Sequence, residues 1–323
     1  MVNTTICWER RRVENMAWFH PDFTIKVVSF LGQDVFTKSK SISITPDFSA
    51  NFINNLLRGD AFNEKIIVTL IETIGNEFLS DKFRWLGNEF WIEKEVNLWE
   101  LKDFVDEERR RELEIFMHPM QPDIDILFGP KVNNERLTPL TAVEVKLFKG
   151  IERGRVTPRA GGGFYEGIGE AIALLTFGVD FVELWQFFFL PIGIEIDIEI
   201  PPHLPPERKK EIKEWFKERK REEKKMKRYI DYICTYADFV GNLIKVLKLP
   251  LGYRCFAISM DMETILLSER ESSYILPKEN PFLVSEDASI VSEAAALIVS
   301  GAVLKIRSLI KEALNVKEGN EGR

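Results

Sequence analysis

The spacing of hydrophobic residues predicts an alternating series of helices and strands across the middle of the chain. Residues 63–86 are predicted to form a helix, because their apolar side chains recur every three to four positions and share one face. Residues 90–98 are then predicted to form a strand. Two more strands are predicted at 122–128 and 141–148. A helix that begins with glycines follows at 161–175, and a last strand at 182–190. Helices alternating with strands predict an α/β fold.

Two of these predicted strands carry their charged residues on one face. Asp123 and Asp125 share a face of the first strand, because side chains alternate along a strand. Glu144 and Lys146 share a face of the second in the same way. A turn-rich segment joins the two strands, so we expect them to pair as a hairpin and to gather their carboxylates and the ammonium on one side of a sheet.

Carboxylates and a lysine gathered in this way suit the hydrolysis of phosphodiesters. Mg²⁺ and similar hard cations prefer oxygen ligands and usually take one or two carboxylates, leaving other positions to water and phosphate. Such a cation polarises the phosphate and lowers the pKa of a bound water. A neighbouring lysine can hold the attacking water or offset charge that develops on the phosphate. The sequence therefore predicts a metal-dependent phosphodiesterase site.

The first of these strands begins with Pro122-Asp123, and the second contains Glu144-Val145-Lys146. This pattern resembles the motif of the PD-(D/E)xK nuclease superfamily, which has the restriction-endonuclease-like fold. The order of the predicted elements around the motif is also that of the family. The resemblance implies that Asp123 and Glu144 bind the metal, Mg²⁺ or Mn²⁺, and that Lys146 is the catalytic lysine. The resemblance also implies that the carbonyl oxygen of Val145 is a further metal ligand. Asp125 is an alternative to Asp123, since it lies on the same face.

The resemblance covers about residues 63–191 and implies additional site residues. Family members often carry an acid on the first helix, and here we favour Glu77 over Glu72. Many carry a tyrosine and glycines that lead to a glutamine at the start of the second helix. This chain has Tyr165 and then Glu170 where the glutamine would fall. That departure keeps open an alternative function, a non-catalytic nucleic-acid-binding or assembly subunit that retains the nuclease fold.

Composition divides the chain into three predicted regions. Residues 1–60 form a β-rich extension or a small domain, 61–200 form the nuclease-like core, and 201–323 contain a charged helix and a mostly helical C-terminal region. The predicted fold is thus a mixed sheet flanked by helices, with additions at both ends. Further strands are predicted at 24–30, 41–44 and 255–260, and an apolar helix at 288–313.

The charged helix follows a proline-rich segment and is predicted over 207–247. The chain has a net charge of −7, so a face that binds nucleic acid must be locally basic. Lysines form one stripe along this helix and glutamates another, and the lysines can bind a phosphate backbone. The other interpretation is a solvated helix with ion pairs between residues three apart. The candidate nucleic-acid-binding residues are Lys209, Lys213, Lys217 and Lys220.

The cysteines, histidines and apolar segments indicate the cellular compartment and the kind of metal that we expect. The three cysteines are widely spaced, which indicates free thiols in a reducing compartment. Three scattered histidines are too few for a zinc cluster, which favours a metal held by carboxylates. The chain shows neither a secretory signal nor an uninterrupted apolar span, so we expect a cytoplasmic protein without a membrane partner. DNA is the favoured partner, and cleavage of both strands would favour a homodimer.

Overall fold

A computed structural model of the chain describes part of its length. The described residues are 38–43, 64–97, 107, 123–133, 135–148, 151–152, 155–156, 167–189, 205–260, 264–283, 307–308 and 311.

Seven strands form one mixed sheet, in the order β1-β10-β9-β8-β5-β3-β2. Their bounds are β1 Lys38–Ser43, β2 Phe90–Val96, β3 Ile124–Val132, β5 Thr141–Phe148, β8 Phe181–Phe189, β9 Leu251–Met260 and β10 Thr264–Glu269. The three central strands β5, β8 and β9 are parallel, and the outer pairs are antiparallel. Short strands lie off this path: β4 Glu135–Arg136 pairs with β3, and β6 Ile151–Glu152 pairs with β7 Arg155–Val156.

Parallel neighbours need a crossover between them, and helices supply both. The helix α6 Ile168–Leu174, with the short 3-10 helix η3 Leu175–Phe177, connects β5 to β8. The long helix α7 Pro206–Val246 connects β8 to β9. A second 3-10 helix, η4 Glu271–Ser273, follows β10.

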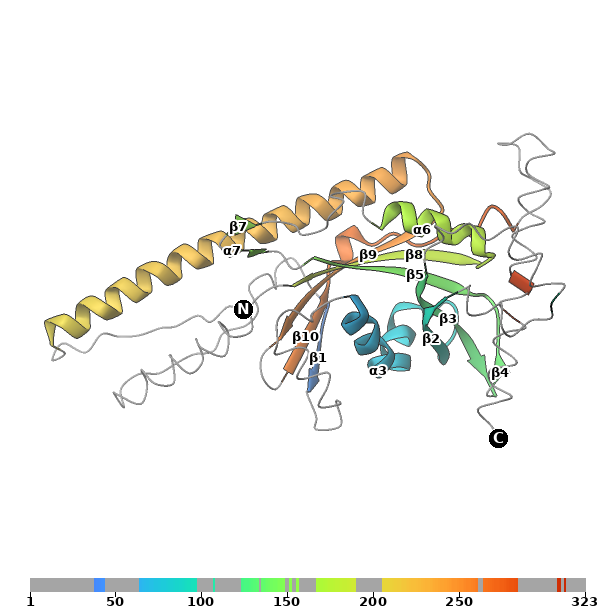
Figure 1. The fold of residues 1–323 in the computed structure, drawn as a ribbon, viewed down its shortest axis with the longest axis horizontal. Helices are drawn as coiled ribbons and strands as arrows, with labels where there is room; N and C mark the ends of the chain where they lie inside the picture. Colours follow the sequence, from blue (N-terminus) through green and yellow to red (C-terminus); the bar gives the residue numbers. More distant parts are fainter. Residues whose placement is uncertain are drawn as a thin grey trace.

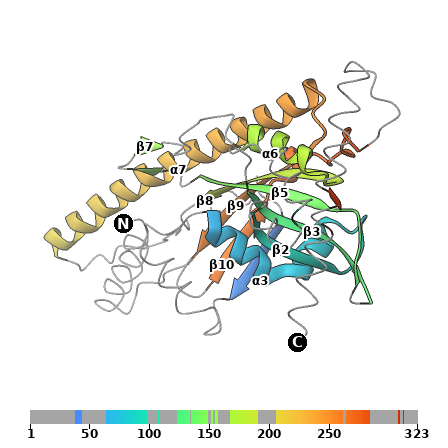
Figure 2. The ribbon, with the colours of Figure 1, turned by 45° about the vertical axis from the view of Figure 1, so that its right-hand side comes forward.

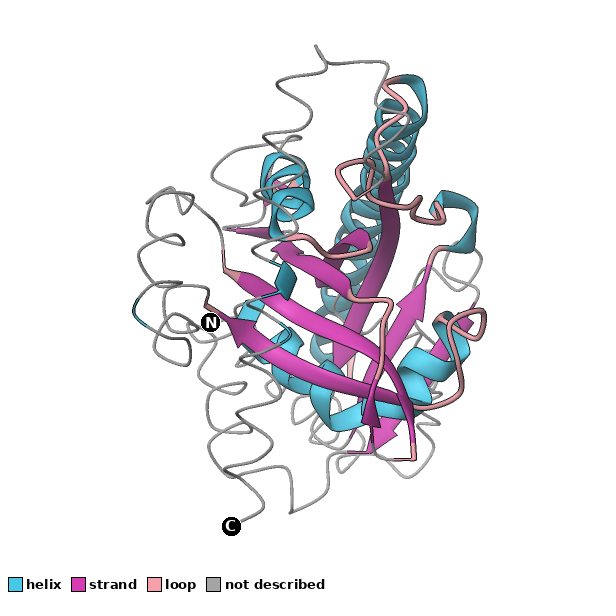
Figure 3. Ribbon diagram, turned by 90° about the vertical axis from the view of Figure 1, so that its right-hand side faces the viewer, coloured by secondary structure: helices cyan, strands magenta, loops and turns pink. Residues whose placement is uncertain are grey.

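Helices cover both faces of the sheet, as Figures 1 and 3 show. The helix α3 Glu64–Lys82 packs Ile67, Ile71 and Phe78 on one face, against side chains of β3, β5, β8 and β9. The helices α6 and α7 pack on the other face in a second core. Because alternate side chains of a central strand point to opposite faces, both sides of β5 are apolar apart from the charged residues described below.

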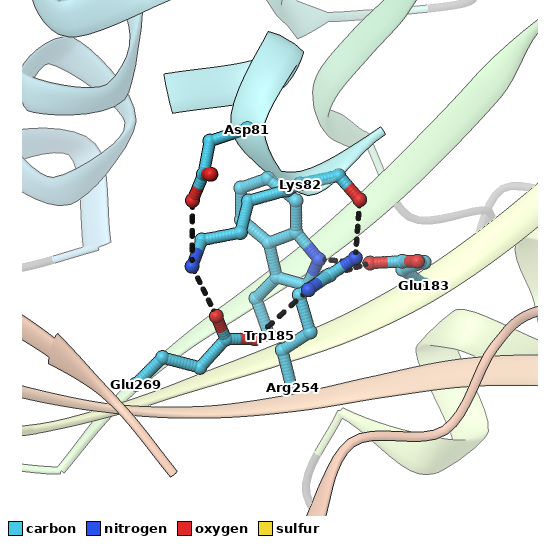
Figure 4. A network of polar contacts seen from close by, with 6 residues as sticks. All are labelled: Asp81, Lys82, Glu183, Trp185, Arg254 and Glu269. Carbon is cyan, nitrogen blue, oxygen red and sulfur yellow. Dashed lines mark hydrogen bonds and ion pairs between the residues drawn. The ribbon is translucent and has the colours of Figure 1, made fainter. Parts of the chain in front are cut away.

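A buried ion network joins α3 to the sheet beneath it (Figure 4). The Arg254 guanidinium on β9 donates from Nε to Glu183 Oε2 at 2.9 Å and from Nη1 to Glu269 Oε1 at 2.8 Å. Lys82, the last residue of α3, pairs with the same Glu269, and Trp185 Nε1 donates to Glu183 Oε2. Glu183 is fully buried, so these contacts compensate a charge that has no access to water.

The structure confirms the predicted α/β class and most predicted elements. The helix expected over 63–86 is α3, and the strands expected at 90–98, 122–128, 141–148 and 182–190 are β2, β3, β5 and β8. The charged helix is α7, a continuous helix of 41 residues. Residues 24–30 and most of 288–313 lie outside the described residues.

The sheet does not end at the boundaries expected at residues 60 and 200. The apolar strands β9 and β10 extend it beyond β8, and β1 pairs along β10 at its edge. Segments from all three predicted regions therefore belong to one sheet. None of the helices in the described part of the chain has the length and apolar character of a membrane span.

Candidate functional site

The pairing of β3 with β5 brings the predicted acids together. The two strands run antiparallel, with Ile126 opposite Val143. One step further along, the backbone N–H of Val145 donates to Asp125 Oδ2 at 2.7 Å. Asp125 thus lies beside Glu144, on the face of the sheet that α6 and α7 cover.

Lys146 is the centre of a cluster of acids from several elements. Its Nζ lies 2.7 Å from Glu144 Oε1 on the same strand and 2.7 Å from Glu170 Oε2 in the first turn of α6. Glu64, the first residue of α3, places its Oε2 3.9 Å from the same nitrogen. The cluster therefore joins Asp125, Glu144, Glu170 and Glu64 around one ammonium, and we call these five side chains the Lys146 cluster.

A glycine allows α6 to begin close enough to β5 for this contact. Gly167 precedes α6 in the left-handed conformation, with φ 83°. A Cβ atom at this position would lie 2.8 Å from Lys146 Cγ and 2.7 Å from Leu184 Cδ1, which is closer than carbon atoms approach. Both the backbone angle and the contact favour glycine at this position, and the resulting close approach places Glu170 over Lys146.

Burial and crowding raise the pKa of two acids of the cluster. Glu144 is 2% exposed. Its burial, its hydrogen bond with Glu170 and the nearby Asp125 charge raise its pKa to about 10, against the attraction of Lys146. Burial raises the pKa of Asp125 to about 6, although the hydrogen bond from Val145 and the Lys146 charge oppose the shift. Burial and the neighbouring acids therefore favour the protonated form of Glu144.

Glu170 and Lys146 keep their charges in the same environment. The hydrogen bond from Glu144 lowers the pKa of Glu170, with further help from Lys146 against burial. Burial lowers the pKa of Lys146, but attraction to Glu144 and Glu170 outweighs it and leaves this pKa above its ordinary value. The side chain of Lys146 is 10% exposed. The lysine is therefore a fixed positive charge held against carboxyl groups in a largely desolvated position.

Four of the side chains predicted for the site meet in the structure, and two predicted acids lie elsewhere. Glu144 and Lys146 are adjacent, and of the two candidate aspartates it is Asp125 whose side chain interacts with them. Asp123 precedes β3 and is exposed. Glu77, the acid favoured on the first helix, is exposed in the C-terminal part of α3 and does not appear among the groups around Lys146.

Glu64 takes the place expected for the acid of the first helix, and sequence reasoning missed it. An acid in the first turn of a helix ordinarily stabilises the helix dipole, so its position gave no sign of a second role. The side chain of Val145 lies in the core on the α3 side, so only its backbone belongs to the cluster. Glu170 is in the cluster, and Tyr165 lies outside the described residues.

The donor set suits a hard divalent cation, although its members are not arranged as ligands. Among the described residues no three His, Cys, Asp or Glu side chains form a metal-ligand group. Lys146 Nζ instead holds Glu144 and Glu170 through one oxygen each. The other oxygen of Glu144, Oε2, is buried and receives no hydrogen bond. An acceptor buried without a donor is costly, and carboxylate oxygens are the ligands that Mg²⁺ and Mn²⁺ prefer, so Asp125, Glu144 and Glu170 fit such an ion by their chemistry.

Comparison of the chain with protein-family models, curated proteins and solved structures found no match. The function of the Lys146 cluster is therefore inferred from its own residues and their geometry.

Proposed function

We propose that the chain is a metal-dependent nuclease with a PD-(D/E)xK site on a restriction-endonuclease-like core, and that it hydrolyses phosphodiester bonds in DNA. The observation that supports this function best is the meeting of Asp125, Glu144 and Lys146 at the paired strands β3 and β5. The order α3-β2-β3-β5-α6-β8, which is the order of elements around the family's motif, supports it as well.

Each residue of the cluster has a distinct role in the proposed reaction. Asp125 and Glu144 would hold Mg²⁺ or Mn²⁺, with Glu170 and the Val145 carbonyl as further oxygen donors. The ion, when bound, supplies charge stabilisation at the phosphate and a water of lowered pKa. Lys146 keeps its positive charge beside this site and can donate hydrogen bonds to the attacking water or to a phosphate oxygen. Glu144 must lose its proton before it can act as a ligand.

Replacement of the two candidate aspartates separates their roles. We expect Asp125→Asn to reduce Mg²⁺-dependent cleavage of a plasmid by about a hundredfold or more, because an amide binds the cation more weakly than a carboxylate. The amide oxygen introduced by this substitution can still accept the hydrogen bond from Val145 N, so the fold should persist. The matched variant Asp123→Asn removes an exposed charge from the residue before β3 and should retain activity within about threefold. The opposite ranking of the two variants would contradict the assignment of Asp125.

Metal binding should raise the melting temperature. A ligand that binds only the folded state stabilises it by about 2.7 kcal/mol at a concentration of about 100 times Kd, which amounts to several degrees. We expect this rise for the wild-type chain with Mn²⁺ in differential scanning fluorimetry, and a much smaller one for Glu144→Gln. An equal rise in both proteins would show that the ion binds elsewhere, and a wild-type curve that Mn²⁺ leaves unchanged would count against a metal site.

One observation favours a second function, that of a non-catalytic nucleic-acid-binding or assembly subunit. Glu170 stands where the family commonly has a glutamine, and its carboxylate holds the lysine that catalysis would use. Such a subunit would bind DNA and leave it uncut in Mg²⁺ and in Mn²⁺. The cleavage assay on the wild-type chain therefore separates the two functions. A homodimer stays a prediction, and light scattering of the purified chain tests it.

A further inference from the structure

The first part of α7 is strongly basic in a chain that is acidic as a whole. Residues 206–228, which we call the basic arm, contain twelve Lys or Arg and six Glu, a net charge of +6. The whole chain has a net charge of −7, so the remainder carries −13. This separation of charge concentrates the positive potential on one helical segment.

The basic arm extends beyond the sheet, whereas the rest of α7 packs on it (Figures 1 and 2). From Tyr229 onward the helix buries one face against the sheet, on the same side as the Lys146 cluster. Within the arm, none of the side chains that the structure describes is buried. The buried residues of the packed part are Tyr229, Ile230, Ile233, Tyr236, Ala237, Val240 and Ile244.

Six lysines of the arm form a continuous stripe. At 3.6 residues per turn they lie within an arc of about 80°, on the side of the helix roughly opposite the face that the packed part buries. The stripe is about 27 Å long at a rise of 1.5 Å per residue. Lys213, Lys217 and Lys224 are exposed, so these three positions of the stripe are open to a partner. The lysine stripe consists of Lys209, Lys213, Lys217, Lys220, Lys224 and Lys227.

Two lysines of the stripe lack acidic neighbours at helical spacing. Lys213 and Lys224 have no acidic residue three or four positions away on either side. Their neighbours at these distances include other stripe lysines, and like charges so placed destabilise a helix. Glutamates of the arm, in contrast, have basic residues three positions further on, such as Lys210 after Glu207. A polyanion along the stripe would relieve the repulsion between its lysines.

We propose that the lysine stripe binds the phosphate backbone of nucleic acid outside the Lys146 cluster. This inference rests on the proposed nuclease function, which supplies a polymer with regularly spaced phosphates as the partner. The stripe presents a lysine about once per helical turn over a length close to one turn of a DNA duplex, about 34 Å. Lysine is a point charge without bidentate geometry, so the contacts carry affinity and no sequence preference.

Two triple variants of the full chain distinguish binding by the stripe lysines from a general effect of the arm's positive charge. Lys213→Gln/Lys217→Gln/Lys224→Gln removes three exposed stripe lysines. Lys210→Gln/Arg221→Gln/Lys225→Gln removes three exposed basic residues of the same arm that lie off the stripe. Both variants change the net charge equally.

Binding is measured by fluorescence anisotropy on a duplex of about two helical turns, roughly 20 base pairs, and on a single strand of the same length. The titrations are made in EDTA, which excludes metal-dependent cleavage, at salt concentrations from about 50 to about 200 mM KCl. For at least one of the two nucleic acids we expect the stripe variant to bind at least about tenfold more weakly at the lowest salt concentration. The off-stripe variant should stay within about threefold of the wild type.

The salt dependence reports the number of phosphate contacts that the stripe makes. For the duplex, the plot of log Kobs against log salt should be shallower by about two to three in the stripe variant, because each phosphate contact contributes about 0.9 to the slope. The nucleic acid that shows the larger difference between the two variants is the one that the stripe binds.

The same measurements separate this inference from the nuclease assignment. Equal losses of affinity in both variants, or no loss of affinity in the stripe variant, would overturn the proposal that the stripe binds nucleic acid. The stripe variant could bind more weakly while the wild-type chain leaves DNA uncut in Mg²⁺ and Mn²⁺. This result would support binding by the stripe and contradict the proposed catalytic function. Far-ultraviolet circular dichroism should match among the three proteins and show that α7 remains folded, because glutamine has a helix propensity close to that of lysine.

Discussion

Lys146→Ala is expected to abolish Mg²⁺-dependent cleavage of DNA while leaving the fold intact. The Lys146 ammonium lies 2.7 Å from both Glu144 Oε1 and Glu170 Oε2, and it is the positive side chain that these acids share. A preorganised charge of this kind in a desolvated site contributes about a hundredfold to a thousandfold to a rate constant, so we expect a loss of at least that size in kcat. The measurement is plasmid nicking under single-turnover conditions.

A second lysine of the sheet supplies the control. Lys94 on β2 pairs with Glu72 as Lys146 pairs with Glu144, but both partners are more than 40% exposed. Lys94→Ala should cut DNA at the wild-type rate. If Lys146→Ala also retained this rate, the Lys146 cluster would have no part in catalysis and the nuclease assignment would fall.

Arg254→Met should destabilise the fold more than any single change in the Lys146 cluster. Its guanidinium bonds Glu183 and Glu269, donates from Nη2 to the Lys82 carbonyl at 3.2 Å, and lies 4.1 Å from the centre of the Tyr274 ring. Loss of the cation leaves the carboxylate of Glu183 buried without a charge to oppose it. Breaking a buried ion pair in this way costs about 3–5 kcal/mol, and urea unfolding followed by circular dichroism measures it.

A second substitution checks why Arg254→Met loses stability. If the unopposed charge of Glu183 is responsible, Glu183→Gln in the Arg254→Met background should recover part of the stability. Lys94→Met, which breaks an exposed pair, should cost less than about 1 kcal/mol. A loss for Arg254→Met no larger than that of Lys94→Met would mean that the network does not hold α3 to the sheet.

The elements of the fold were predictable because their residues follow simple periodicities. The helix α3 repeats its apolar residues at helical spacing, and the strands β3 and β5 alternate apolar with charged residues. The extent of the sheet was not predictable in the same way. The strands β1 and β10 lie far apart along the chain and pair only in three dimensions, so no local pattern shows that they extend one sheet.

The candidate site shows the same limit at the level of single residues. Glu144 and Lys146 were predictable from their spacing on one strand, but Asp123 and Asp125 share a face and only the register with β5 distinguishes them. Glu64 enters the cluster because α3 begins beside it. The Arg254 network was not predicted either, since its members lie far apart in sequence on α3, β8, β9 and β10.

A crystal structure of the chain soaked in Mn²⁺, with anomalous diffraction data, tests the central claim most directly. We predict an anomalous peak bound by Asp125 and Glu144, with Lys146 no longer bonded to Glu144 through the oxygen that binds the ion. A peak at Asp123 alone, or no peak within reach of Glu144 at a concentration that saturates other Mn²⁺ sites, would contradict a metal-dependent nuclease site in the Lys146 cluster.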